Sequence, residues 1–334
     1  MEKLIVSSSP HIHSKTTTQG IMRDVLIALA PAAIAATVLY GLKALLIIVT
    51  CVASAMVSEF LFNLACKKEQ TLNDLSAAVT GLILALSLPA NVELWQCVIG
   101  AVFAIVIVKC VFGGLGCNFA NPAATARIML FLSFSASIGG GLATRFVNPD
   151  VTASFVNPEL VASATPLEII KMGGEKELSE IFKELPSLLD MLIGNRAGAI
   201  GEGCALAVII GGVYLIVRRV IRWHTPAVCI ATVFVLSLLI KGDVTVALYE
   251  TLGGGLLFAS FFMITDYVTT PINKIGKMVF ALGCGILTVL FRFWGSYPEG
   301  ISFAILIMNI LTPYIEKLCE YKPLGKVGKK NEVK

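Results

Sequence analysis

The sequence predicts an all-α integral membrane protein in which about ten transmembrane helices form two halves of opposite orientation. Hydrophobic residues make up 56% of the 334 residues and charged residues only 14%, whereas soluble domains average about 45–50% and about 25%. The mean hydropathy is +0.84. One polar stretch separates two apolar blocks, and an odd number of spans in each block inverts the second block relative to the first. These observations exclude a soluble globular fold.

Ten apolar segments are long enough, or nearly so, to cross a hydrocarbon core about 30 Å thick as helices. The segments at 75–88 and 278–291 are short for a full crossing, so we expect them either to tilt little in a thinned region or to be broken helices. The complete set is 24–40, 44–64, 75–88, 95–112, 123–140, 197–217, 226–241, 244–262, 278–291 and 300–315.

These segments divide the chain into four regions. The first five-helix membrane repeat is expected at 1–140 and the second at 197–316. Between them lies a polar loop at 141–196, and a basic tail follows at 317–334. Inverted repeats of this kind place their working site near the middle of the bilayer, between the two halves.

Basic residues set the expected orientation. With the N-terminus in the cytoplasm, most of the 26 Lys and Arg residues lie on the cytoplasmic side. Both termini are therefore expected in the cytoplasm and the 141–196 loop outside, in a multi-pass protein of the bacterial cytoplasmic membrane. The net charge of +4 is explained by this bias, so it does not indicate nucleic-acid binding. Residues 1–23 are polar, which argues against a cleavable signal.

The nine cysteines are scattered, mostly within apolar segments. None forms a CxxC pair and none lies in the 141–196 loop, so neither a disulfide framework nor a thiolate metal site is indicated. Cysteines in such positions are typical small buried hydrophobes. No metal site is expected.

Two amides interrupt the apolar sequence after the fourth span. Asn118 and Asn121 follow a glycine-rich turn, and Pro122 then suits the first position of the next helix. A helix start flanked by amides can bind an anion or a carbonyl-rich ring. It can equally be a simple start in which Asn121 is the N-cap.

Two carboxylates fall inside predicted spans. Glu59 lies about one turn from the end of its segment and Glu250 about two turns into its own. Ionisable residues at such depths mark ion paths or pair with a buried partner. Both interpretations remain open for each residue.

The 141–196 loop contains the sequence Val161-Ala-Ser-Ala-Thr-Pro-Leu167. On the residues alone, Ser163-Ala164-Thr165-Pro166 is an ordinary turn sequence. The hydroxyl of Thr165 is nevertheless expected outside the lipid, where the sequence places few other candidate sites for a reaction.

Four segments in order carry a resemblance to a known family. They are Ser9–His13 followed by Thr18, Gly113–Arg127, Ala164–Leu167 and Gly194–Glu202. In this order, and on this hydropathy profile, the chain resembles the D subunit of Rnf-type ion-translocating electron transport complexes. It is more distantly similar to the B subunit of the sodium-pumping NADH:quinone oxidoreductase. The resemblance covers essentially the whole length and implies a urea-transporter-like inverted repeat.

The resemblance implies a covalent cofactor. In that family FMN is attached through its phosphate to a threonine by a separate flavin transferase. By position the acceptor is Thr165, with Ser163 and Ala164 in the same motif. The chain departs from the family pattern at Ala162, where a hydroxyl is usual, and at Ser163, where glycine is frequent.

The resemblance also implies a second, non-covalent flavin. Relatives hold riboflavin near amides that match Asn118 and Asn121. Three residues apart, these amides would share a face if helical. The N-cap interpretation of Asn121 accounts for the same residue.

The function implied is that of a translocase component that is not expected to be active alone. Electrons from reduced ferredoxin would enter through other membrane and peripheral subunits, cross flavin on this chain and leave toward NAD, driving Na⁺ or H⁺ transport. The chain has neither a nucleotide-binding glycine loop nor a ferredoxin-like cysteine run, so other chains are expected to bind NADH and ferredoxin. The remaining expected partners are the flavin transferase and membrane lipid, with no nucleic acid.

Two other functions fit the same hydropathy profile. A solute transporter or channel built on the inverted repeat would have no redox role, and its 141–196 loop would be a connector. A structural anchor would hold redox partners together without flavin. Covalent flavin on Thr165 distinguishes the flavin-carrying translocase component from both of these alternatives.

Overall fold

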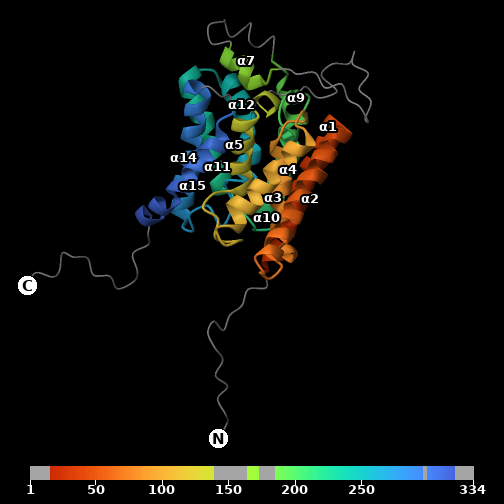
Figure 1. Ribbon diagram of the computed structural model, residues 1–334. Helices are drawn as coiled ribbons and strands as arrows, with labels where there is room; N and C mark the ends of the chain where they lie inside the picture. Colours follow the sequence, from red (N-terminus) through yellow and green to blue (C-terminus); the bar gives the residue numbers. More distant parts are fainter. Residues whose placement is uncertain (1–15, 139–163, 173–184, 296–298, 320–334) are drawn as a thin grey trace, which may run out of the picture.

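The computed structural model of the protein describes residues 16–138, 164–172, 185–295 and 299–319 (Figure 1). All regular elements in these residues are helices. The expectation of an all-α membrane protein is therefore confirmed in its class. The acidic part of the polar loop, Ser163, the Ser9–His13 motif and most of the basic tail lie outside the described residues.

The first half begins with two long helices joined at a single glycine. Thr17 caps the first helix by accepting a hydrogen bond from the backbone N–H of Gly20, and Gly41 ends it with φ of 76°. Glycine adopts this left-handed region without steric cost, so the next helix starts immediately. The elements are α1 (Thr18–Tyr40), α2 (Leu42–Ala65), η1 (Leu72–Asp74), α3 (Ser76–Ser87), α4 (Leu94–Val102), the π-helical η2 (Phe103–Cys110), α5 (Pro122–Ser133) and α6 (Ser135–Ile138).

Short helices precede the second half, which again contains long apolar ones. The short elements are α7 (Pro166–Met172), α9 (Leu188–Ile193) and η3 (Ile200–Glu202). The second half comprises α10 (Ala205–Val217), α11 (His224–Lys241), α12 (Val244–Leu252), α13 (Leu256–Phe262), α14 (Lys274–Trp294) and α15 (Ile301–Leu318).

Five described helices are long and apolar enough to cross a membrane on their own, namely α1, α2, α11, α14 and α15. The α12–α13 pair passes the same test as one span but is bent by 53°. The remaining apolar helices, α3, α4 with η2, α5 and α10, are shorter. The structure thus has five or six spans by length among its described residues.

Several predicted boundaries were wrong. The segment 278–291 belongs to a full-length helix of 21 residues, α14, because the helix continues through its flanking basic residues. The segment 244–262 is not one helix, since three glycines at 253–255 separate α12 from α13. The segment 197–217 becomes α-helical only at Ala205.

The segment 75–88 behaves as a broken span, which was one of its two expected forms. Helix α3 ends at Ser87, and Leu88 follows in an extended conformation while fully buried. The carbonyl of Leu88 accepts from the backbone N–H of Ile200, at a distance of 2.9 Å. Non-helical backbone inside a membrane protein needs such partners, because lipid supplies none.

Small residues allow the helices to approach closely. A Cβ at Gly81 of α3 would lie 2.8 Å from the carbonyl oxygen of Cys51 in α2 and 3.1 Å from the Ala55 Cβ. Such contacts are typical of helix packing in lipid, where dispersion and close approach replace the hydrophobic effect. The halves meet where α1 packs on α10 and α5 on α15.

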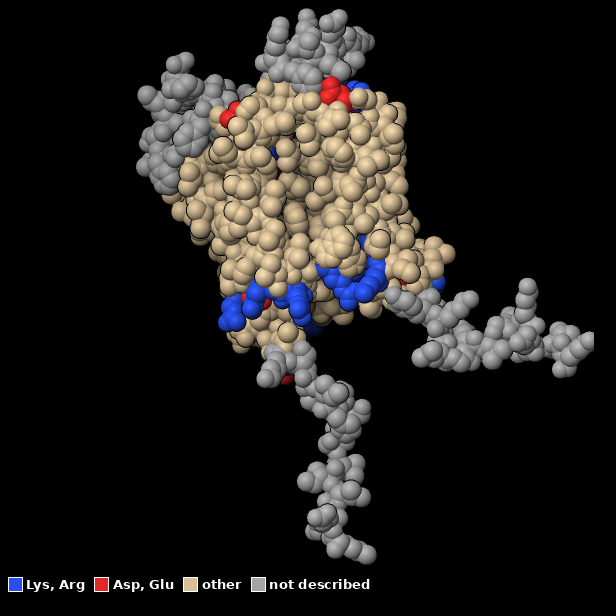
Figure 2. Space-filling model, turned by 180° about the vertical axis from the view of Figure 1, so that it is seen from behind, with Lys and Arg blue, Asp and Glu red and all other residues tan. Residues whose placement is uncertain are grey.

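The outer surface of the bundle is apolar, as lipid contact requires. Between 28% and 39% of the residues in the apolar windows of the spans are buried inside the protein, and many of their large side chains, such as Ile34 and Leu46, are exposed. Figure 2 shows a broad belt without charged side chains, with Lys and Arg gathered along one edge. Helices α7 and α9 lie at one end of the bundle in Figure 1, and α1 begins toward the other.

Candidate functional site

Thr165 stands at the start of α7. Its hydroxyl accepts a hydrogen bond from the backbone N–H of Glu168 at 3.3 Å, and its own N–H donates to the Glu168 carboxylate at 2.7 Å. This reciprocal arrangement is a capping box, and Pro166 occupies the first helical position. Thr165 is only 7% exposed, while the neighbouring Ala164 is exposed.

Helix α7 is held against the second half by its apolar face. Leu167 and Ile170 are buried, and Ile170 packs in a small cluster with Val246 and Tyr249 of α12. Lys171 donates to the carbonyl of Gly295 at 2.6 Å. Partial burial lowers the pKa of the Lys171 ammonium.

The seat of α7 is the break between α12 and α13. The side chain of Leu167 fills the space beside Gly253 and Gly254, so that a Cβ at Gly254 would overlap it. Gly254 and Gly255 have φ of 61° and 66°, a region that disfavours other residues. A single segment thus provides a bend in a membrane span and a notch for the helix that carries Thr165.

Arg292 of α14 hydrogen-bonds to backbone carbonyls at this break. Its guanidinium donates to the carbonyl of Gly253 at 3.1 Å and to the Glu250 carboxylate at 3.0 Å. It also donates to the carbonyls of Glu250 and Gly254. Because a broken helix exposes carbonyls to a medium without water, the five-donor fork of arginine is suited to this position.

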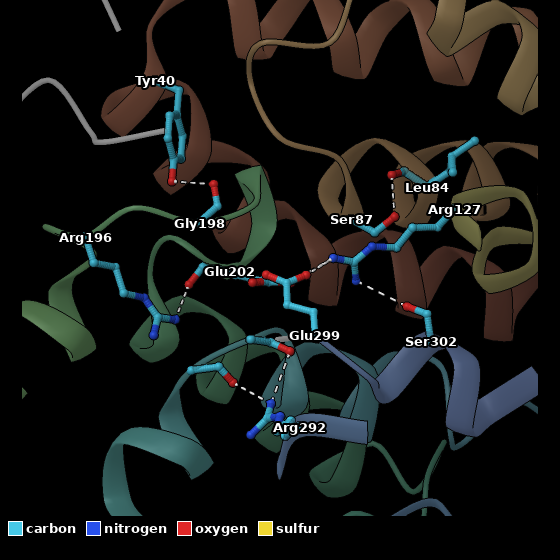
Figure 3. A network of polar contacts seen from close by, with 12 residues as sticks. Tyr40, Leu84, Ser87, Arg127, Arg196, Gly198, Glu202, Arg292, Glu299 and Ser302 are labelled. Carbon is cyan, nitrogen blue, oxygen red and sulfur yellow. Dashed lines mark hydrogen bonds and ion pairs between the residues drawn. The ribbon is translucent and has the colours of Figure 1, made fainter. Parts of the chain in front are cut away.

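A second buried arginine holds the segment before α10. Arg196 donates to the carbonyl of Glu202 at 2.6 Å (Figure 3). It also donates to the carbonyl of Leu252 at 2.9 Å. Tyr40 of α1 donates to the carbonyl of Gly198 at 3.3 Å. The non-helical stretch that the sequence had suggested as a helix is therefore fixed by side chains from two directions.

Arg127 connects the two halves. It lies on α5 and contacts Glu299, which precedes α15, and Ser302 in the first turn of α15, the latter at 3.3 Å. The carboxylate of Glu202 lies 3.5 Å from the same guanidinium. Figure 3 shows these side chains converging between helices of the first and second halves.

Sequence reasoning missed this charge network, although Arg127 and Glu202 both lie in segments that carried the family resemblance. Of the two carboxylates that the sequence singled out, Glu250 lies beside this network, and its pairing alternative is confirmed by Arg292. The available signal was arginine and glutamate in otherwise apolar surroundings, where unpaired charges are not tolerated.

Glu59 is likewise paired. Its carboxylate accepts from the Lys109 ammonium at 2.8 Å and from the Thr71 hydroxyl at 2.6 Å. Lys109 also donates to Ser76 at 2.6 Å, and it is 1% exposed at the end of the π-helical η2. Buried charges of this kind persist only with a partner.

The predicted amides line a cavity. Asn121 is the N-cap of α5, accepting from the N–H groups of Ala123 and Ala124 at 3.1 and 3.2 Å, which confirms the capping interpretation. Asn118 differs, because its buried side-chain oxygen has no hydrogen-bond partner among the described residues. Both line a cavity of about 100 Å³, together with Lys109 and Asp266.

A larger cavity of about 630 Å³ adjoins it and shares Asn118, Tyr267 and Val268 in its walls. Residues at the start of α1, such as Ile21, line the smaller cavity, and α1 begins toward the end opposite α7 (Figure 1). The structure therefore does not bring Thr165 and Asn118 together. They belong to two sites toward opposite ends of the bundle.

Comparison with known proteins gives full-length matches. One relative, from Acetobacterium woodii, is named as the D subunit of a Na(+)-translocating ferredoxin:NAD(+) oxidoreductase complex. It is 40% identical over 333 residues, which cover 99% of this chain and 98% of the relative. Another, from Clostridium ljungdahlii, is named as the D subunit of a proton-translocating ferredoxin:NAD(+) oxidoreductase complex and is 38% identical, with 96% of each chain covered.

A third relative, from Halorhodospira halophila, is named as the D subunit of an ion-translocating oxidoreductase complex and is 36% identical, with 92% of each chain covered. The model of the NQR2, RnfD, RnfE family matches residues 5–325. The resemblance drawn from the four segments is thus confirmed, and the chain belongs to the NQR2, RnfD, RnfE family.

Proposed function

We propose that this chain is the flavin-carrying membrane subunit of an ion-translocating ferredoxin:NAD oxidoreductase complex, coupling electron transfer to Na⁺ or H⁺ transport. The observation that carries the proposal is its end-to-end similarity to the D subunits of two such complexes, at 40% and 38% identity. As one component of a larger assembly, it works with other membrane and peripheral subunits and within membrane lipid.

The covalent cofactor we propose is FMN, linked by a phosphate ester to the Thr165 hydroxyl. The residues fit such a link. Thr165 directly precedes the short helix α7, which lies at one end of the bundle (Figure 1), and it is next to the exposed Ala164. When bound, the isoalloxazine ring would supply the one- and two-electron chemistry that the amino acids lack. The chain's contribution is the acceptor hydroxyl itself, on a residue next to α7.

A second, non-covalent flavin is proposed at Asn118 and Asn121, with riboflavin as the expected form. The unpartnered side-chain oxygen of Asn118 supports this assignment, because a buried hydrogen-bond acceptor without a donor costs free energy. The imide N–H of the flavin ring or a hydroxyl of its side chain would supply that donor. The adjoining cavity of about 630 Å³ offers room beyond the smaller one. Asn118 would accept a hydrogen bond, and Asn121 would hold the start of α5.

The proposed membrane arrangement is ten crossings in two inverted halves, urea-transporter-like, with both termini in the cytoplasm. The packing supports it: α2 contacts α3 and α4 in the first half, as α11 contacts α12, α13 and α14 in the second. Helix η2 then packs on α5 as α14 packs on α15. The basic edge in Figure 2 fits a cytoplasmic side.

Mass spectrometry of the peptide that contains Thr165 tests the proposed function. Protein from cells that also make the flavin transferase should carry a mass increment equal to FMN minus water, and the denatured band should fluoresce. Thr165→Ala should abolish both signals, while Thr165→Ser, which keeps a hydroxyl, should retain some of each. An unmodified Thr165 peptide from such cells would overturn the covalent assignment and favour a transporter without a redox role.

A further inference from the structure

We propose that α7 must leave its seat on the α12–α13 break before Thr165 can accept flavin, and that Leu167 sets how often it leaves. The inference rests on the proposed attachment of flavin to Thr165 and names the residue that controls it. Leu167 is thus a positioning residue for the modification, acting through the helix that carries the acceptor.

In the docked position of α7, the Thr165 hydroxyl is not open to an incoming phosphate. Thr165 is 7% exposed, and its oxygen already accepts from the N–H of Glu168. A side chain that water reaches so little is closed to a flavin phosphate, which is many times larger than water. The carboxylate of Glu168, 2.7 Å from the Thr165 nitrogen, also places negative charge beside the hydroxyl that an incoming phosphate must approach.

The chemistry of attachment needs the opposite arrangement. The Thr165 oxygen attacks the phosphorus of a flavin dinucleotide and forms an O–P bond in line with the bond that breaks. The anhydride P–O bond breaks and its electron pair leaves with the nucleoside monophosphate. The hydroxyl proton passes to a base of the transferase. This step needs the Thr165 oxygen to be open to the flavin phosphate, and α7 in its seat leaves Thr165 only 7% exposed.

Among the described residues, three unequal contacts hold α7. The helix has seven residues, too short to persist alone in water. Leu167 fills the notch beside Gly253 and Gly254, Ile170 packs on α12, and Lys171 makes one hydrogen bond to Gly295. Leu167 is the only one of these three that enters the break itself, so its removal should weaken docking most directly.

The expected behaviour is a two-state equilibrium in which only the undocked form is modified. The rate of attachment is then proportional to the undocked fraction, and a mutation that weakens docking raises it. Leu167→Ala removes a buried leucine side chain, so we expect attachment to proceed at least about tenfold faster than in the natural chain. If α7 were modified in place, the same change would leave the rate unaltered or lower it.

The test uses the full chain purified without flavin from cells that lack the transferase. Flavin adenine dinucleotide and transferase are added, and the fluorescence of the denatured band is followed with time. Leu167→Ala is compared with Leu189→Ala, a matched change on α9 whose leucine is 69% exposed and which should modify at the natural rate. Thermal unfolding of both variants shows that each is folded.

Hydrogen exchange of the amides in 167–172 supplies a second measurement that does not depend on flavin. Leu167→Ala should speed exchange there and nowhere in α14. Faster exchange with faster attachment supports the inference. Faster exchange with unchanged or slower attachment overturns it, while the proposed function stands. Absence of flavin on Thr165 in every variant overturns the attachment, and this inference with it.

Discussion

The carboxylate of Glu202 occupies the space that a side chain at Gly255 would need. Glu202 comes from η3, ahead of α10, and Gly255 precedes the first residue of α13. A buried carboxylate thus packs against the bend between α12 and α13. The same carboxylate lies 3.5 Å from Arg127 of the first half. The bend, the inter-half contact and the glycine therefore depend on one another.

Gly255→Ala should lower the free energy of unfolding by more than the cost of placing alanine at a positive φ. Gly242 is the matched control, since its φ of 69° resembles the 66° of Gly255 but no atom lies within 4 Å of its added Cβ. Gly242→Ala should cost about 1–2 kcal/mol, and Gly255→Ala a further roughly 1–3 kcal/mol through the overlap with Glu202. Thermal unfolding in detergent measures both, and equal losses would contradict the contact.

Arg127→Ala should destabilise the protein by about 3–5 kcal/mol, because it leaves the Glu202 and Glu299 carboxylates without their cation. Arg127→Lys should recover only part of this loss, since an ammonium lacks the planar fork that reaches two or three partners at once. Arg222→Ala, at an exposed position, serves as the control and should change the unfolding temperature little. An Arg127→Ala variant as stable as the control would show that the network does not hold the halves together.

Lys109→Met should cost about 3–5 kcal/mol, since the Glu59 carboxylate then remains buried and unpaired. Adding Glu59→Leu to the same chain should restore much of the loss, because an apolar pair of similar volume avoids the desolvation of both ions. A double-mutant cycle in thermal unfolding gives the coupling energy. Additive losses would mean that the 2.8 Å contact contributes nothing specific.

The two amides should respond differently to substitution. Asn118→Ala should lower the amount of non-covalent flavin that is extracted from the purified protein, while thermal stability stays close to that of the natural chain. Asn121→Ala should cost about 1 kcal/mol by removing the cap of α5, and Asn121→Asp, which keeps the capping oxygen, should not. Extracted flavin is quantified after acid precipitation. Unchanged flavin in Asn118→Ala would remove Asn118 from the proposed site.

Much of the fold follows from the sequence because hydrophobic length is a strong signal in lipid. The membrane class was predicted correctly, and α1, α2 and α11 lie close to their expected ranges. Helix ends were predicted less well. In a soluble protein polar residues mark the exposed face, but here both lipid-facing and buried positions are apolar. Nothing in the pattern of 278–291, for example, shows that α14 extends to Lys274 and Trp294.

The polar network could not be predicted for a different reason. Arg127 and Ser302 are far apart in the chain, and pairing across such a distance leaves no local pattern. Glu59 and Glu250 were recognisable as intramembrane charges, but their partners Lys109 and Arg292 were not. The three glycines at 253–255 did carry a signal for the break, since a run of glycine inside an apolar segment disfavours continuous helix.

The π-helical η2 determines which changes of length the helix from α4 to η2 can tolerate. A residue deleted from an α-helix rotates everything beyond it by about 100°, whereas a π-helical segment can lose one residue by returning to α-helical geometry. A one-residue deletion within 103–108 should therefore keep the Lys109 ammonium near Glu59, while the same deletion within α4 should turn it away. Relatives that are one residue shorter before the glycine-rich turn should keep the lysine and have an α-helix in place of η2.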